Sequence, residues 1–247
     1  AWRPLYKEAT TAADARALAL ATPLDTVPGA RYVYSDLGAI TLAAVVERIT
    51  GEPLDRFVAR EIFEPLGMTE TRYLPPAEWM DRIAPTEFDP WRGRHVRGEV
   101  HDENAYALGG ISGHAGLFST GHDVARFATM YLNGGTLDGR RIFAPTTIET
   151  FAARQDASLS HRALGWETPT GRNSAGTRMS ARAFGHTGFT GTSLWMDRDA
   201  GVWVVLLTNR VNPTRERSGI GPARTRLADA ALAALGIVAP DSAATPR

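Results

Sequence analysis

The side chains that could take part in chemistry gather in short stretches of the 247-residue chain. In Gly185–Thr192, the imidazole of His186 stands among glycines, directly before a strongly apolar run. Because glycine has no Cβ, a second backbone or a ligand can approach such a strand closely. This pattern is typical of the edge of an active-site cleft. A partly buried polar histidine without a catalytic role is the alternative interpretation.

Serine chemistry has weak local support. Ser112 lies in the glycine-rich stretch Gly109–Gly116, but a nucleophile elbow needs Gly-x-Ser-x-Gly, and Gly110–His114 fails at the last position. The stretch also lacks the Gly-Lys-Ser/Thr ending of a phosphate-binding loop. The other serine device, Ser-x-x-Lys, is absent from these residues, because the lone lysine, Lys7, has Pro4 three positions before it.

Histidines and carboxylates also cluster in one region, which raises the question of a metal site. The group comprises His101-Asp102-Glu103, His114 and His122. Their spacing does not include the His-Glu-x-x-His pattern of a helical zinc site, and His122 fits better as a first-turn helix residue. We therefore expect no metal and no other cofactor. A metal-dependent hydrolase using His101, His114 and His186 is kept as a third, weaker hypothesis.

Composition excludes several classes of function. The chain is 43% hydrophobic and 22% charged, as expected for a globular protein, and Lys+Arg and Asp+Glu both number 27. This balance gives no electrostatic reason to bind nucleic acid. Cysteine is absent, which excludes disulfides and thiolate chemistry but sets no compartment. No apolar run reaches the roughly 18 residues of a membrane span.

Helices and one hairpin must position these residues. Residues 8–21 are alanine-rich and predict a helix. Ser35 or Asp36 can cap a second helix with a broad apolar face that stops at Gly51, and Pro53 starts a third. The stretch from Tyr73 to Thr120 loses periodicity, and its three aromatics, Phe88, Trp91 and Tyr106, indicate either an ordered cleft lining or satellite packing.

The second half of the chain predicts more regular elements. A capping signal at Thr120 starts a helix to Gly134, Pro145 starts a short one, and a last helix covers 223–235. Residues 163–167 predict a strand. Ser193–Asp197 and Val202–Asn209 are β-rich runs joined by a short Asp/Gly turn, which predicts a hairpin.

Tyr34-Ser35-Asp36 at the head of an apolar helix, about 150 residues before His186-Thr187-Gly188 on a hairpin strand, resembles the serine β-lactamase and penicillin-binding-protein-like superfamily. The branch that it resembles holds class C β-lactamases, D-aminopeptidases and esterases. Further stretches similar to this branch are 51–54, 62–68, 115–120 and 207–210. Each motif is weak by itself, but the ordered set is specific and covers nearly the whole chain.

The resemblance implies an α+β fold of the β-lactamase/transpeptidase type, with an antiparallel sheet, flanking helices and a helical subdomain. We expect residues 1–26 to be a lead-in from the middle of the parent fold, 27–238 to form a single domain and 239–247 to be a disordered tail. The family's Ser-x-x-Lys helix and first strands correspond to sequence before Ala1. The chain is therefore expected to be a fragment that lacks the N-terminal strands of the sheet.

The resemblance also assigns roles to residues. Tyr34 corresponds to the catalytic tyrosine that takes and returns the proton of a nucleophilic serine, which requires a nearby cation because a phenol has an unperturbed pKa of about 10. Asp36 and the strand residues His186, Thr187 and Gly188 would bind substrate, and the N–H of Phe189 would form half of an oxyanion hole.

Two departures from the family pattern bear on the substrate. Asp36 stands where β-lactamases commonly have asparagine, and His186 stands where a permanently charged lysine is common. Both favour an esterase-like hydrolase that acts on a small ester or amide through an acyl-enzyme. Because the resemblance places the nucleophilic serine and its lysine before Ala1, the fragment alone is expected to be inactive. A non-catalytic penicillin-binding-like module that binds peptidoglycan or a protein partner is the rival.

The apolar run Val202–Leu207 predicts a strand buried on both faces at the centre of a sheet. Without its N-terminal neighbours, such a sheet would have an unpaired edge strand, whose free N–H and C=O groups could pair with another chain. We therefore expect poor stability, or pairing with the missing segment or a second chain. The resemblance alone favours an extracytoplasmic location, periplasmic or secreted.

Overall fold

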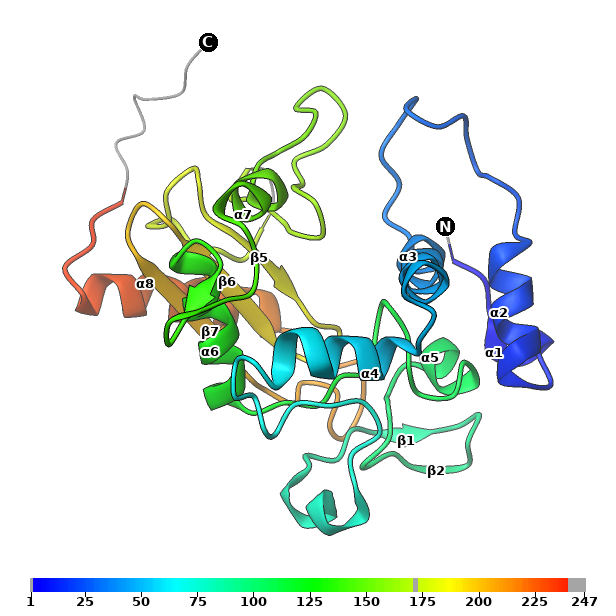
Figure 1. The fold of residues 1–247 in the computed structure, drawn as a ribbon. Coiled ribbons are helices and arrows are strands. Elements are labelled where there is room, and N and C mark those ends of the chain that lie inside the picture. Colours follow the sequence, from blue (N-terminus) through cyan, green and yellow to red (C-terminus); the bar gives the residue numbers. More distant parts are fainter. Residues whose placement is uncertain (1, 171–172, 240–247) are drawn as a thin grey trace. The chain divides into compact units, whose positions relative to one another are not determined.

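A computed structural model describes residues 2–170 and 173–239 (Figure 1). Nearly all of the tail expected at 239–247 lies outside the described residues. Backbone contacts divide the chain between Thr120 and Gly121 into two compact units, which are described separately below.

The first unit is mainly helical. It contains α1 (Leu5–Glu8), α2 (Ala12–Leu20), α3 (Asp36–Thr50), α4 (Leu54–Val58), the π-helical turn η1 (Ala59–Phe63), the 3-10 helix η2 (Ala77–Arg82), β1 (Phe88–Asp89), β2 (Arg94–His95) and α5 (Glu103–Ala107).

Local signals in the sequence set the ends of the first helices. Thr11 and Asp14 form a reciprocal capping box, so α2 starts later than residue 8. The Ser35 hydroxyl accepts a hydrogen bond from the N–H of Gly38 at 3.1 Å and caps α3, and Gly51 ends that helix with φ 75°. Pro53 directly precedes α4, as expected.

The core of this unit lies between α1, α2 and α3. Leu5, Ala15, Ala19, Leu37 and Ile40 are buried together. Since Leu37 and Ile40 lie in the first turns of α3, this packing fixes the helix end that follows Tyr34.

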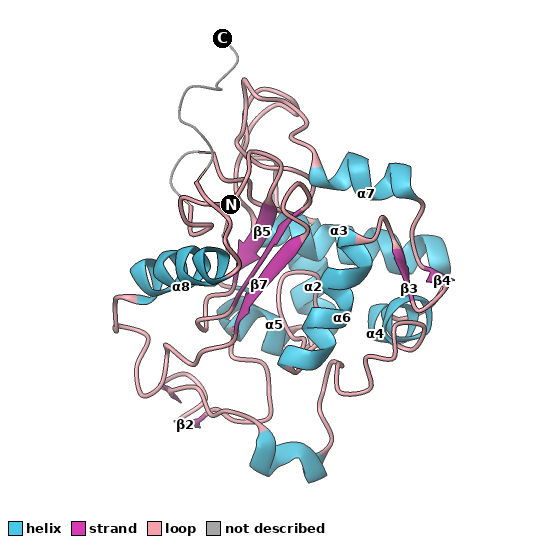
Figure 2. Cartoon of the chain, turned by 90° about the vertical axis from the view of Figure 1, so that its left-hand side faces the viewer, coloured by secondary structure: helices cyan, strands magenta, loops and turns pink. Residues whose placement is uncertain are grey.

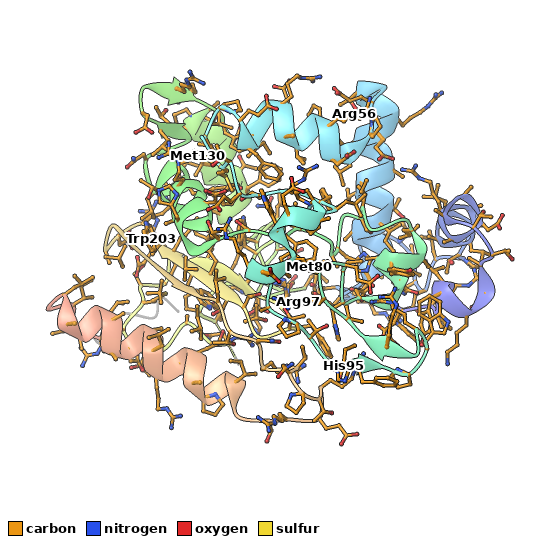
Figure 3. All side chains as sticks on the ribbon, turned by 90° about the horizontal axis from the view of Figure 1, so that it is seen from below. Arg56, Met80, His95, Arg97, Met130 and Trp203 are labelled. Atoms are coloured by element: carbon orange, nitrogen blue, oxygen red, sulfur yellow. The ribbon has the colours of Figure 1, made fainter. Side chains whose placement is uncertain are left out.

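The aperiodic stretch between Tyr73 and Thr120 is ordered by short elements. Antiparallel β1 and β2 pair Phe88 with His95. The Arg97 side chain donates to the carbonyl oxygens of Ile83 at 2.8 Å and Asp81 at 2.9 Å, next to η2, where Met80 also lies (Figure 3).

The aromatic side chains of this stretch pack against one another. The Trp91 ring lies 4.9 Å from Tyr6 and 5.9 Å from Tyr106 between ring centroids, and Phe88 packs against His95. Within the first unit these contacts match the satellite-packing alternative.

The second unit surrounds a small sheet. It contains α6 (Gly121–Leu132), β3 (Thr136–Leu137), β4 (Arg140–Arg141), α7 (Pro145–Ala152), β5 (Phe184–Thr187), β6 (Ser193–Asp197), β7 (Val202–Leu206) and α8 (Ile220–Ala234).

Strands β5, β6 and β7 form an antiparallel sheet in that order (Figure 2). Helix α6 packs against β6 and β7, and α8 packs against β7. Trp195 of β6 is buried with Ala228 and Leu232 of α8. The hairpin prediction is confirmed, and the α+β class with a flanked antiparallel sheet is confirmed as well.

Two local predictions are wrong. Residues 163–167 do not form a strand; Ala163 and Glu167 take part only in isolated bridges, because Ala163 bonds back to Trp166 in a tight turn. Strand β7 is not buried on both faces. It is an edge strand of the described sheet, and its residues are half-buried except for Trp203, which is 38% exposed (Figure 3). The indole N–H of Trp203 donates to the Thr129 hydroxyl of α6 at 3.1 Å.

Within residues 2–170 and 173–239, none of the helices has both the length and the apolar character that crossing a bilayer requires.

Candidate functional site

Tyr34 and Asp36 flank the start of α3 in the first unit. The Tyr34 side chain is 58% exposed, and Asp36 lies in the first turn. Ser35 between them is committed to the cap, so its hydroxyl accepts from the backbone. The arrangement presents a phenol and a carboxylate at the N-terminal end of a helix that is anchored by its buried face.

A loop of the same unit supports this helix. Gly113 lies so close to α3 that a Cβ there would stand 2.9 Å from the carbonyl carbon of Ala39 and 3.1 Å from the Cβ of Ala43. The Tyr73 hydroxyl donates to the carbonyl oxygen of Ser112 at 2.9 Å. Burial, together with the charge of Asp55, raises the pKa of Tyr73 to about 12, so this phenol stays a donor.

The loop is also held from its other side by a hydroxyl–imidazole–carboxylate chain. Ser112 Oγ lies 2.8 Å from His114 Nδ1, and His114 Nε2 lies 2.9 Å from Asp102 Oδ1. Asp102 additionally caps α5 by accepting from the N–H of Ala105 at 2.7 Å.

The connectivity is that of a catalytic triad, but Ser112 is buried and its carbonyl is tied to Tyr73. These hydrogen bonds from Ser112 through His114 to Asp102 therefore anchor the loop. Asp102 and His114 were grouped from sequence as possible metal ligands but were not connected to Ser112, because the residue types do not show which groups bond to each other.

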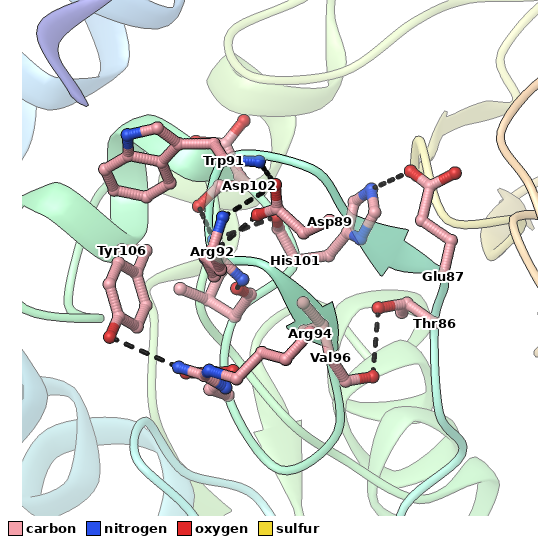
Figure 4. Close-up of polar contacts among 12 residues, drawn as sticks. Thr86, Glu87, Asp89, Trp91, Arg92, Arg94, Val96, His101, Asp102 and Tyr106 are labelled. Carbon is pink, nitrogen blue, oxygen red and sulfur yellow. Dashed lines mark hydrogen bonds and ion pairs between the residues drawn. The ribbon is translucent and has the colours of Figure 1, made fainter. Parts of the chain in front are cut away.

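Buried ion pairs extend this network toward the β1–β2 hairpin (Figure 4). Arg92 Nε lies 3.1 Å from Asp89 Oδ2, and its guanidinium donates to the carbonyl oxygens of Val100, His101 and Asp102. His101 Nε2 lies 3.4 Å from Glu87. Arg92 and Asp89 thus have oppositely charged partners, as burial requires, whereas the His101–Glu87 contact is an ion pair only when the imidazole is protonated.

No group of three or more histidine, aspartate or glutamate side chains in the described part of the chain is arranged to hold a metal ion. His101 and His114 are engaged as described, and His186 belongs to the second unit.

The strand β5 and the turn after it carry the second group of expected site residues. His186 and Thr187 end β5, and Gly188 and Phe189 begin the turn into β6. Gly185 is needed for close packing, because a Cβ there would stand 2.5 Å from the Trp195 ring. The Phe189 ring is 59% exposed.

Two arginines hold this turn by donating hydrogen bonds to its carbonyl oxygens. Arg224 of α8 donates to the carbonyl oxygens of Gly188 at 2.8 Å and Thr192 at 2.7 Å. Arg210 donates to the carbonyl oxygen of Phe189 at 2.8 Å, and its guanidinium lies 4.4 Å from the Phe189 ring centre. Burial lowers the pKa of Arg224, as does the charge of Arg210, although Glu167 opposes them.

His186 contacts a charged pair on the preceding turn. Its Nε2 lies 2.9 Å from Arg162 Nη1, and Arg162 Nη2 donates to Glu167 Oε1 at 2.6 Å. Sequence reasoning missed Arg162, Glu167, Arg210 and Arg224. The pairing of Glu167 with Gly185 brings Arg162 and Glu167 next to β5. The contacts of Arg210 and Arg224 with the turn depend on the fold and could not be read from the sequence, although Arg210 ends the family-like stretch 207–210.

The expected site residues thus form two groups. Tyr34 and Asp36 lie together in the first unit, and His186, Thr187, Gly188 and Phe189 lie together in the second. Their roles stay predictions.

Several solved structures have a fold similar to that of this chain. A penicillin-binding protein homolog from Caulobacter crescentus matches with a TM-score of 0.69 at 21% identity, over 94% of this chain and 66% of that one. Simvastatin synthase (LovD) from Aspergillus terreus matches with a TM-score of 0.69 at 17% identity, over 93% of this chain and 63% of that one. At these identities the likeness concerns the fold alone.

Relatives in sequence are more similar. A protein of Escherichia coli K12 named "Putative D-alanyl-D-alanine carboxypeptidase" is 37% identical over 212 residues, which is 76% of this chain and 47% of the relative. A protein of the same name from Salmonella agona is 37% identical over 236 residues, 83% of this chain and 53% of the relative. The chain spans about half the length of these relatives. Residues 1–229 match the family model described as Beta-lactamase, and the chain therefore belongs to the beta-lactamase family.

Proposed function

We propose that the chain is part of a serine hydrolase that acts through an acyl-enzyme on a small ester or amide. Tyr34 is the proton relay, Asp36 contacts the substrate, and the strand from His186 to Phe189 forms the substrate wall with an oxyanion donor at the N–H of Phe189. The observation that carries the proposal is the turn after β5, which Arg224 and Arg210 hold through its carbonyl groups. Because the backbone N–H of Phe189 is then already in place, no free energy is spent on reorienting it when negative charge develops on the substrate oxygen.

Family membership supports the serine chemistry, and the exposure of Tyr34 supports its role as the relay. The nucleophilic serine and its lysine are proposed to lie outside these residues. The sequence has one lysine, Lys7, and Pro4 occupies the position that a nucleophile would need. The 247-residue chain alone is therefore expected to be inactive. An extracytoplasmic location belongs to the same proposal.

Asp36 favours an ester substrate, because a carboxylate only accepts hydrogen bonds whereas an amide side chain also donates them. A D-alanyl-D-alanine carboxypeptidase is the second candidate. Arg162, next to His186, places a permanent positive charge beside the strand, as a substrate with a free carboxylate requires. The names of the relatives point to the same substrate class.

Hydrolysis of p-nitrophenyl acetate and of a diacetylated Lys-D-Ala-D-Ala peptide, by this chain and by the full-length gene product, tests the proposal. Tyr34→Phe in the full-length protein is expected to lower kcat by about 10²- to 10⁴-fold, because it removes proton transfer. Tyr32→Phe, a matched control two residues earlier, is expected to leave kcat near wild type. Tyr34-dependent turnover by this chain alone would refute the proposal that the nucleophilic serine lies outside these residues. Absence of Ser-x-x-Lys in the full gene favours the non-catalytic binding module instead.

A further inference from the structure

The His186 ring offers both of its nitrogens to neighbours of fixed polarity. Arg162 Nη1 lies 2.9 Å from Nε2, and the carbonyl oxygen of Thr187 lies 2.8 Å from Nδ1. A guanidinium has only donors, and a carbonyl oxygen only accepts. The contact with Arg162 therefore requires a lone pair on Nε2, and the contact with Thr187 requires a proton on Nδ1.

We infer that His186 is a neutral imidazole protonated at Nδ1, and that Arg162 is the positioning residue that enforces this state and supplies the fixed positive charge of the strand. The tautomer follows from the contacts alone. Its part in substrate handling rests on the proposed function.

Arg162 is itself held rigidly enough for this role. Its Nη2 donates to Glu167, whose carboxylate is its ion-pair partner, and both side chains are about four-fifths shielded from solvent, at 22% and 20% exposure. The backbone N–H of Glu167 donates to the carbonyl oxygen of Gly185 at 2.7 Å, and the N–H of Gly185 returns a bond at 3.0 Å. The turn that carries Arg162 is thus bonded to β5 one residue before His186.

Aromatic packing supports the same turn. The Trp166 ring lies 5.6 Å from Phe184 of β5 and 5.5 Å from Tyr131 of α6. The turn between Ala163 and Trp166 is closed by a backbone hydrogen bond of 3.0 Å. Movement of Arg162 away from His186 would therefore disturb a packed cluster as well as an ion pair.

The assignment changes what His186 can do. With its Nε2 lone pair occupied by Arg162 and its Nδ1 proton bonded to Thr187, the ring is not available as a general base. It instead links the turn at 162–167 to the strand that leads to Phe189. The positive charge beside the strand resides on the guanidinium of Arg162.

The ¹⁵N chemical shifts of the His186 ring, measured by long-range ¹H–¹⁵N NMR on the labelled chain and assigned with a His186→Gln variant, test the inference. The expected pattern is a protonated Nδ1 and an unprotonated Nε2. Arg162→Gln is expected to shift His186 toward the Nε2-protonated tautomer that predominates in free imidazoles, and Arg162→Lys is expected to retain most of the wild-type pattern. A protonated Nε2 in the wild type, or an unchanged pattern in Arg162→Gln, overturns the inference.

Glu167→Gln provides a second variant if Arg162→Gln does not fold. It keeps the guanidinium but removes its carboxylate partner, so partial loss of the Nδ1-protonated pattern is expected, and an unchanged pattern contradicts the role of the pair.

In the active full-length protein, Arg162→Gln is expected to lower kcat/KM for a substrate with a free carboxylate by about tenfold or more, relative to its effect on p-nitrophenyl acetate. Equal loss on both substrates contradicts the charge role. If the full-length protein proves inactive, the proposed function fails, while the NMR result still decides the tautomer.

Discussion

Replacing Gly113 with alanine probes the contact that supports the helix after Tyr34. The new Cβ would stand 3.1 Å from the Cβ of Ala43 and well inside contact distance of the carbonyl group of Ala39. The obstructing carbonyl belongs to the backbone of α3, whose inner face is buried against α1 and α2, so it cannot rotate away as a flexible side chain would. The loop must therefore separate from α3, or α3 must shift.

Overpacking of this kind typically costs about 1–3 kcal/mol, and we expect Gly113→Ala in the upper part of that range because the neighbour is rigid. For a protein of this size, each kcal/mol corresponds to a change in Tm of about 2–4 °C. Gly221 of α8 is the matched control, since a Cβ there meets nothing within 4 Å. Gly221→Ala is expected to stabilise the fold by up to about 1 kcal/mol, because alanine loses less backbone entropy than glycine in a helix.

Thermal unfolding followed by circular dichroism, with hydrogen exchange of the α3 amides, measures both effects in the same version of the protein. The expected result is a lower Tm and faster exchange in α3 for Gly113→Ala, and an equal or higher Tm for Gly221→Ala. A Gly113→Ala variant within about 0.5 kcal/mol of wild type, a size typical of surface substitutions, would refute the argument that the loop supports α3.

Three further outcomes are expected. Burial opposes ionisation of Asp102, but the hydrogen bond and charge of His114, with the N–H groups of Ala105 and Asn104, bring the pKa of Asp102 below its ordinary value. Its ionised form therefore stabilises the fold above the unfolded pKa of about 3.9 and ceases to do so as pH falls through the folded pKa. Asp102→Asn should lower Tm at pH 7 by an amount equivalent to about 1–3 kcal/mol, with a smaller deficit at pH 3; equal deficits in the two melts contradict the linkage. Trp195→Ala should cost about 3–5 kcal/mol in urea unfolding, since the ring is buried under Gly185 and its indole N–H donates to Ser174 at 3.1 Å; a cost near 1 kcal/mol would show that the core collapses around the gap. Finally, the exposed edge of β7 should cause self-association or poor stability of the isolated chain in analytical ultracentrifugation, and a monodisperse monomer that melts cooperatively would contradict this.

Much of the fold was predictable because its signals are local. Caps such as Ser35 and stops such as Gly51 act within one helical turn, so their residue types alone locate the ends of α3. The hairpin of β6 and β7 follows from two β-rich runs and the turn between them. The expected strand at 163–167 was wrong because the chain turns back between Ala163 and Trp166, with Gly165 at φ 78°.

The candidate site divides in the same way. Tyr34, Asp36 and the strand from His186 to Phe189 were proposed from sequence, because each lies in a short motif that resembles the family, and their roles remain predictions. Arg162, Arg210 and Arg224 act through contacts with residues that are distant along the chain, and these contacts are not visible in the sequence even for Arg210, which ends the family-like stretch 207–210.

The sequence by itself therefore determined the family resemblance, the α+β class, the ends of α3 and which residue types are available for chemistry. Only the tertiary structure decided how those residues are held. It places a guanidinium against His186, which sets the protonation of the ring, and it joins Ser112, His114 and Asp102 into an anchor for the loop behind α3. Hydrogen-bond polarity and charge depend on which groups meet in space, and the chain brings these groups together only when it folds.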